Sequence, residues 1–105
     1  MNSTKIQFIN HASVLISYNN IGLLSDPWYD HTVFHKGWRL LYETQLEDVL
    51  NVLDSTSHIF ISHEHPDHFN TSFFLNKEIK NKILKKKYKS FISKKLRWKG
   101  KKFFI

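Results

Sequence analysis

The chain has 105 residues, which is enough for one compact domain and too few for two. It contains no Cys, so disulfides and thiolate metal sites are excluded. Hydrophobic residues make up 41% of the chain and aromatic residues 15%, so it can form a packed core and is not globally disordered. No apolar run has the length of a transmembrane helix or a signal peptide, so we expect a cytoplasmic protein without a membrane span.

The net charge of +7 is distributed unevenly along the chain. Residues 1–76 hold three Lys and Arg against eight Asp and Glu, whereas residues 77–105 hold thirteen against one. We interpret the basic part as a solvated amphipathic segment, because runs of charge usually lie on a solvated face. The alternative is a binding module whose basic, aromatic tail contacts nucleic acid or an anionic surface. We favour the solvated segment over nucleic-acid binding.

Alternation of apolar and polar residues predicts three short strands near the start of the chain, at 6–8, 14–18 and 21–24. Asn19-Asn20 predicts a tight turn between the second strand and the third. Pro27 ends the third strand, because proline cannot continue the ladder. The aromatic stretch 28–43 has no periodicity, and we expect an ordered loop that packs down on the domain.

The next segment predicts a helix followed by a strand. Thr44 and Glu47 have capping-box spacing, and a helical face of leucine and valine follows them. Residues 58–62 form a short apolar strand that leads into a polar loop, where α/β folds usually place their chemistry.

The pattern of the remaining residues is helical. A short helix is expected at 73–75, and apolar residues recur at helical spacing over 79–96, with a break near 85–87. Residues 103–105 resemble the beginning of a strand.

A dense group of potential ligands follows the apolar strand: Ser62-His63-Glu64-His65-Pro66-Asp67-His68. In an extended segment His63 and His65 point to the same side and can share one ion. Pro66 turns the chain, so that Asp67 and His68 can face a second ion. Imidazoles and a carboxylate suit zinc, and also iron or manganese. The alternative is a solvated polar loop, which this specific spacing disfavours.

At these residues the chain resembles the metallo-β-lactamase superfamily, whose signature is His-x-His-x-Asp-His after a buried strand. The stretches 10–16 and 24–28 resemble the opening strands of its lactonase-like and phospholipase-D-like branch. The stretch 34–38 is similar to a bacterial group found with surface-polysaccharide genes and related to the CMP-sialic acid hydroxylase. The resemblance covers residues 5–76. It implies an α/β fold, the N-terminal half of an αββα sandwich with a mixed sheet and flanking helices.

The resemblance also implies a role for each residue of the motif. His63 and His65 would hold the first metal ion, and Asp67 and His68 the second. Asp67 would in addition accept a proton during turnover, as a catalytic residue.

Two residues outside the motif are implied as well. Asp26 would be a carboxylate that orients a ligand histidine from behind. His11 would lie near the site and contact substrate, and the alternative is a hydrogen-bonded histidine at a strand edge. Three further histidines are expected to be structural or exposed: His31, His35 and His58.

The implied activity is hydrolysis. In the family a metal-bound hydroxide attacks an ester, lactone, amide or phosphodiester. The expected substrate is a small molecule such as a metabolite of a polysaccharide pathway. An iron-dependent redox variant exists in the wider superfamily, so the metal alone does not settle the reaction.

The family's site also needs later ligands, and no His or Asp follows His68 in this chain. We therefore expect a truncated and catalytically incomplete chain that binds metal weakly. Residues 1–76 would form the N-terminal half of the domain, and residues 77–105 its continuation. One sheet face would lack its partner, which predicts self-association through an exposed apolar surface.

Overall fold

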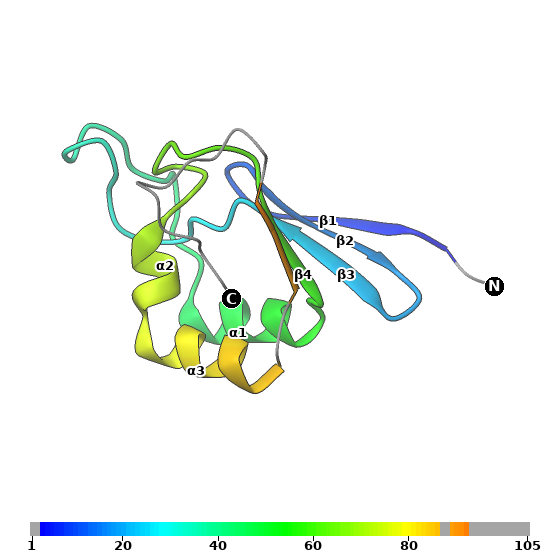
Figure 1. Cartoon of the computed structure of the whole chain (residues 1–105). Coiled ribbons are helices and arrows are strands. Elements are labelled where there is room, and N and C mark those ends of the chain that lie inside the picture. The colour runs from blue at the N-terminus through cyan, green and yellow to red at the C-terminus, as the bar shows by residue number, and fades with distance from the viewer. Residues whose placement is uncertain (1–2, 87–88, 93–105) are drawn as a thin grey trace.

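The computed structural model describes residues 3–86 and 89–92, which form a five-stranded mixed sheet and three helices (Figure 1). The strands follow one another across the sheet in chain order, as β1 (Lys5–Asn10), β2 (Ser13–Tyr18), β3 (Ile21–Ser25), β4 (His58–Ile61) and β5 (Lys89–Ile92). The first three strands form an antiparallel meander, and β4 and β5 add to it in parallel. The predicted α/β class with a mixed sheet is confirmed. That it is half of a larger sandwich stays a prediction.

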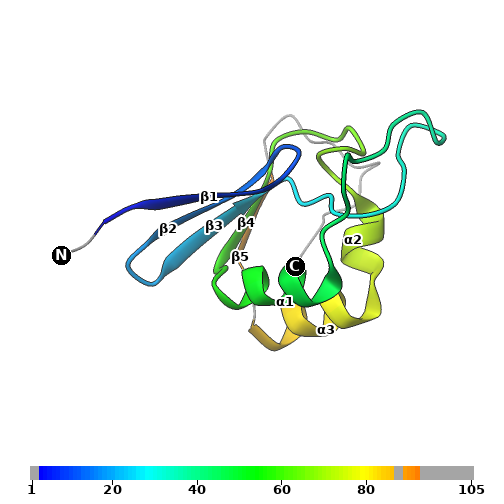
Figure 2. The same ribbon diagram turned by 180° about the vertical axis from the view of Figure 1, so that it is seen from behind.

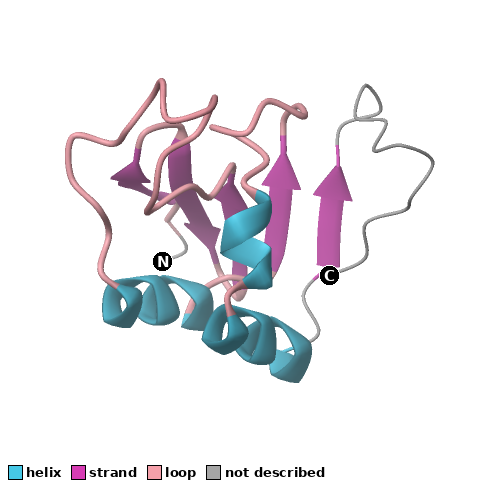
Figure 3. Ribbon diagram, turned by 90° about the vertical axis from the view of Figure 1, so that its left-hand side faces the viewer, coloured by secondary structure: helices cyan, strands magenta, loops and turns pink. Residues whose placement is uncertain are grey.

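The helices lie on one side of the sheet and cover its core face (Figures 2 and 3). They are α1 (Leu46–Asp54), α2 (Thr71–Leu75) and α3 (Lys77–Lys86). Leu15 of β2 pairs with Leu24 of β3, and Leu24 pairs with Ile59 of β4, so these buried side chains share that face. They pack with buried residues of the helices, among them Leu53 and Ile83. None of the described helices has the length and hydropathy needed to cross a membrane.

The opposite face of the sheet is also apolar. Ile6 pairs with Ile16, and Ile16 pairs with Leu23, so the three side chains point away from the helices. Among the residues that the structure describes, no helix covers this face (Figures 1 and 2). Its exposed large side chains are Ile6, Phe8, Tyr18, Ile21 and Phe60. The expected apolar surface is therefore present, and self-association through it stays a prediction.

The predicted capping box at the start of α1 is wrong. The helix begins one residue later than a Thr44 cap requires, and its N-cap, Gln45, makes no side-chain capping hydrogen bond. Thr44 is engaged elsewhere, because its hydroxyl oxygen accepts a hydrogen bond from Asn10 Nδ2 at 3.0 Å. Thr44 also donates its backbone N–H to the carbonyl oxygen of Tyr29 at 2.8 Å. A tertiary contact therefore displaces the local motif.

The predicted helical pattern over 79–96 is correct only in its first part. α3 ends at Lys86, within the break expected near 85–87, and β5 then begins at Lys89. Phe91 and Ile92 pair in parallel with Phe60 and Ile61 of β4. The open edge of β4 offers backbone partners that outweigh the local helical pattern. The strand expected at 103–105 lies outside the described residues.

Gly22 is needed where β3 passes closest to the end of α1. A β-carbon added at this position would lie 1.9 Å from the backbone oxygen of Ser55. The backbone of Gly22 also donates to Ser57 Oγ and accepts from the Ser57 N–H, at 2.9 and 2.8 Å. The clash between an added β-carbon and the backbone oxygen of Ser55 cannot be relieved by rotating a side chain, because the Ser55 atom belongs to the backbone.

We expect Gly22→Ala to lower the free energy of unfolding by about 1–3 kcal/mol or more, because overpacked sites must shift their backbone. The adjacent Ile21→Ala is the control, because Ile21 is half exposed and its truncation should cost less than about 1 kcal/mol. Urea denaturation followed by circular dichroism measures both. Equal stability of the two variants would contradict the packing role of Gly22.

Candidate metal site

The candidate site lies at the edge of the sheet where β3 and β4 end and where the chain turns from β1 into β2. His11 lies in that turn, Asp26 directly follows β3, and the loop that contains the motif follows β4. The carboxyl ends of parallel strands meet at one edge, and ligands of open α/β sheets usually bind there. The topology therefore brings three segments that are distant in sequence to one place.

Asp26 is the buried centre of this edge. Its Oδ1 accepts a hydrogen bond from the backbone N–H of Ser62 at 2.7 Å, and its Oδ2 accepts one from the Ser62 hydroxyl at 2.7 Å. His68 Nδ1 lies 2.9 Å from the same Oδ2. Because an ionised carboxylate only accepts, this contact needs a proton on His68 Nδ1 and turns Nε2 toward Asp67. Asp26 thus lies where a carboxylate that orients a ligand histidine would lie.

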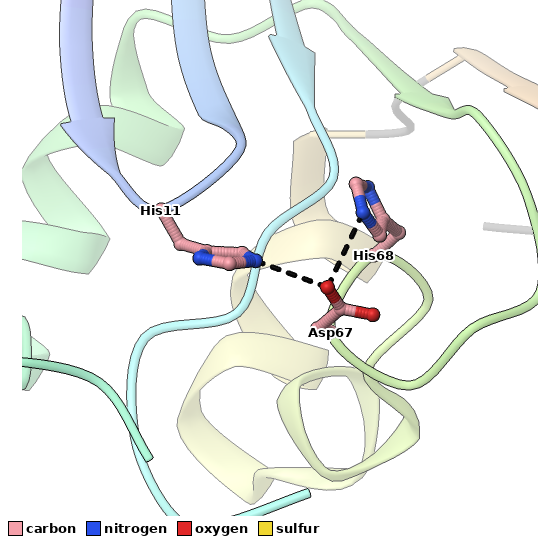
Figure 4. Close-up of side chains that lie close together, drawn as sticks. All are labelled: His11, Asp67 and His68. Carbon is pink, nitrogen blue, oxygen red and sulfur yellow. Dashed lines mark hydrogen bonds and ion pairs between the residues drawn. The ribbon is translucent and has the colours of Figure 1, made fainter. Parts of the chain in front are cut away.

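The side chains of His11, Asp67 and His68 converge on one point. Asp67 Oδ2 lies 3.3 Å from His68 Nε2 and 3.0 Å from His11 Nε2, so both rings point toward one carboxylate oxygen (Figure 4). The donor atoms of His11, Asp67 and His68 all lie within 4.8 Å of one another. Asp67 is buried, whereas the His11 side chain is about one-third exposed. This trio of two imidazoles and one carboxylate fits zinc, iron or manganese by donor chemistry.

The structure gathers the other two histidines of the motif beside this trio. The His63 ring lies 4.0 Å from the His68 ring and 4.8 Å from the His65 ring, measured between centroids. Ser62 Oγ lies 2.8 Å from His63 Nδ1, so the serine links Asp26 to this ring as well. The rings of His63 and His65 therefore lie next to His68, but the group of donor atoms within 4.8 Å of one another consists of His11, Asp67 and His68, without His63 or His65. The assignment of the motif residues to two separate ions, and a proton-accepting role for Asp67, stay predictions.

His11 is more central than the sequence indicated, because its ring contacts a motif carboxylate directly. It occupies a left-handed backbone conformation, with φ of 50°, in the turn between β1 and β2. Its ring packs edge-on against the buried Trp28, with centroids 5.0 Å apart. The resemblance implies a position near the site, and the strand order gives the reason, because it brings this turn to the loop after β4.

The remaining histidines lie away from the trio. His31 and His35 are exposed in the loop between β3 and α1. His58 begins β4, at the other end of this strand from the motif, and its Nδ1 lies 2.7 Å from Ser57 Oγ.

The aromatic loop packs down only in its first part. Trp28, Tyr29 and Val33 are buried as expected, but Phe34 and Trp38 are exposed, so the prediction for the later part is wrong. The reason is a turn that carries the chain outward: Phe34, His35 and Lys36 all have φ between 52° and 68°. Left-handed conformations of this kind cost about 1–3 kcal/mol each outside glycine and persist only when neighbouring contacts hold them.

Tyr29 supports the site rather than taking part in proton transfer. Burial raises the pKa of its phenol well above the usual range, and the hydrogen bond with Ser13 offsets this only in part. The Tyr29 hydroxyl lies 2.7 Å from Ser13 Oγ, and the Tyr29 ring packs edge-on against Phe73 of α2. Tyr29 is therefore a neutral side chain that ties the loop to β2 and α2.

Comparison with curated proteins finds similarity to cytidine monophosphate-N-acetylneuraminic acid hydroxylases. The enzyme of Asterias rubens is 35% identical over 66 residues, which is 63% of this chain and 10% of that protein. The enzymes of Danio rerio and Mus musculus are 32% and 34% identical over 63 and 64 residues, covering 60% and 61% of this chain and 10% and 11% of theirs. This chain therefore spans about a tenth of the length of these relatives. No family model and no solved structure matches, and membership of the metallo-β-lactamase superfamily stays a prediction.

We expect Asp26→Asn to change the protonated nitrogen of His68. The asparagine NH₂ group cannot accept a hydrogen bond, so the Nδ1–H of His68 loses its acceptor and the Nε2–H form gains population. The free energy of unfolding should fall by about 1–3 kcal/mol, because buried donors are left unpaired. Imidazole ¹⁵N chemical shifts report the tautomer directly.

Asp30→Asn is the matched control, because the Asp30 side chain is 45% exposed and lies 3.5 Å from the exposed His31. It should leave the His68 tautomer unchanged and alter stability by less than about 0.5 kcal/mol. A wild-type His68 that is protonated on Nε2 would contradict the role assigned to Asp26.

Proposed function

We propose that this chain provides the metal-binding loop of a metal-dependent hydrolase of the metallo-β-lactamase type. The observation that carries the proposal is the chain of contacts from Asp26 through His68 to Asp67 and His11. Such a chain turns imidazole nitrogens and a carboxylate oxygen toward the same space, which is how ligands are oriented for a divalent ion. When bound, zinc at such a site supplies Lewis-acid chemistry for hydrolysis.

The protein groups have separable tasks in this proposal. Asp26 and Ser62 fix the orientation of the motif loop from the buried side. His63, His65, Asp67 and His68 are the candidate ligands, with Asp67 also the candidate proton acceptor. His11 holds Asp67 from the exposed side of the site. The substrate is then a small molecule with an ester, lactone, amide or phosphodiester bond.

The donor count limits what these residues can do by themselves. No His or Asp follows His68 in the sequence, so the chain offers the motif residues and His11 but no later set of ligands. A two-ion hydrolytic site in the family needs more donors than these. We therefore propose that the loop binds metal weakly and that efficient turnover needs donors besides these residues.

A second candidate function is iron-dependent oxidation, and the similarity to hydroxylases favours it. Imidazole and carboxylate ligands suit iron(II) as well as zinc. Two measurements separate the candidates. The first is hydrolysis of a phosphodiester by the zinc-loaded chain. The second is dioxygen consumption by a chain that is loaded with iron(II) under exclusion of air and then exposed to dioxygen. Hydrolysis by the zinc-loaded chain would support a hydrolase. Dioxygen consumption by the iron-loaded chain without hydrolysis would support the oxidation candidate.

We expect the chain dialysed against excess zinc to hold about one equivalent of metal, and His63→Ala/His65→Ala to hold much less, because two of the motif's imidazoles are removed. Elemental analysis per chain measures the content. The control is His31→Ala/His35→Ala, which removes the same number of histidines from exposed positions outside the cluster. Equal metal content in the two double variants would mean that the motif does not hold the ion.

A further inference from the structure

The loop between β3 and α1 presents two exposed aromatic rings beside the candidate metal site. Trp38 is 52% exposed and Phe34 is 38% exposed. Their ring centroids lie 5.1 Å apart with an angle of 65° between the planes, so the two rings form a corner. Large aromatic side chains that remain exposed next to polar groups are typical of ligand sites.

Each of these rings contacts a different histidine of the cluster. The Phe34 centroid lies 6.2 Å from that of His65, and the Trp38 centroid lies 6.5 Å from that of His11. Both distances are in the range of edge-to-face aromatic pairs. The corner is therefore continuous with the site on two sides, with His65 at one ring and His11 at the other.

The backbone holds this corner in place. Val33 and Trp38 exchange two backbone hydrogen bonds, of 3.0 and 3.2 Å, across the turn. The Gly37 N–H donates to the Phe34 carbonyl oxygen at 2.9 Å. At the base of the loop, Trp28 Nε1 donates to the carbonyl oxygens of Asp30 and His31. A surface fixed in this way loses little conformational entropy when a ligand binds.

We propose that Phe34 and Trp38 form a platform that binds a ring of the substrate while the metal-binding cluster faces the bond to be cleaved. The inference rests on the proposed function, because it assigns a substrate class to that same site. An aromatic face recognises a flat ring face, either of a planar heterocycle or of the apolar side of a sugar ring. The substrate class is then a ring compound with its scissile group next to the ring.

The test uses the full chain after treatment with a chelator, so that it does not depend on metal. Adenosine monophosphate, ribose 5-phosphate and methyl β-D-glucopyranoside are titrated while the ¹H–¹⁵N indole signals are followed, and Trp38→Phe assigns the Trp38 signal. Adenosine monophosphate should shift this signal and ribose 5-phosphate should not, since only the first carries a planar ring. A shift with the glucopyranoside instead would identify a sugar ring. If neither adenosine monophosphate nor the glucopyranoside shifts the Trp38 signal, the proposal is overturned.

Variants separate this inference from the proposed function. In isothermal titration calorimetry, which needs no indole signal, Trp38→Ala and Phe34→Ala should each weaken binding of the active probe about tenfold. Tyr42→Ala, which removes an exposed aromatic side chain on the α1 side of the loop, should not. Metal content should be the same in all three. Unchanged probe affinity in both ring variants overturns the platform. Probe binding by a chain that takes up no metal would retain the platform while rejecting the metal-dependent function.

Discussion

The buried carboxylate of Asp26 accepts hydrogen bonds from the backbone and hydroxyl of Ser62 and from His68, and the polar edge of the molecule depends on these contacts. Asp26 is 5% exposed, so its charge needs partners, and among the described residues Ser62 and His68 of the loop after β4 provide them. The aspartate also donates its backbone N–H to the carbonyl oxygen of Phe60 at 2.9 Å. One residue thus joins the ends of two parallel strands and sets the orientation of the histidine next to them.

Strand order then determines which other residues reach this edge. β3 and β4 are adjacent and parallel, so their ends meet, and the β1–β2 turn lies at the same end because β2 is antiparallel to β3. His11 therefore meets Asp67 although 56 residues separate them in sequence. Both His11 and Asp26 have left-handed backbone conformations, with φ of 50° and 38°. Such conformations outside glycine are uncommon and cluster at functional sites.

The two apolar surfaces of the chain differ in character. The sheet face opposite the helices is a broad surface of strand residues such as Ile6 and Phe8. The aromatic corner of Phe34 and Trp38 is small, lies on a turn closed by backbone hydrogen bonds and touches two histidines of the cluster. The first is extended and built from strand side chains, whereas the second is confined to one turn and has the imidazoles of His11 and His65 directly beside it.

Local patterns in the sequence predict the mixed α/β class, the first four strands and the place of the motif after β4. These features follow from local alternation of apolar residues, from turn residues and from the dense spacing of histidines, all of which act within a few positions. Other features depend on contacts between segments that are distant in the sequence. Thr44 binds Asn10 instead of capping α1, and residues 89–92 pair with β4 instead of continuing a helix. His11 joins Asp67, and Trp38 stands exposed beside it. In each case a partner distant in sequence offers a hydrogen bond, a strand edge or a packing surface, and local propensity is too weak to resist it.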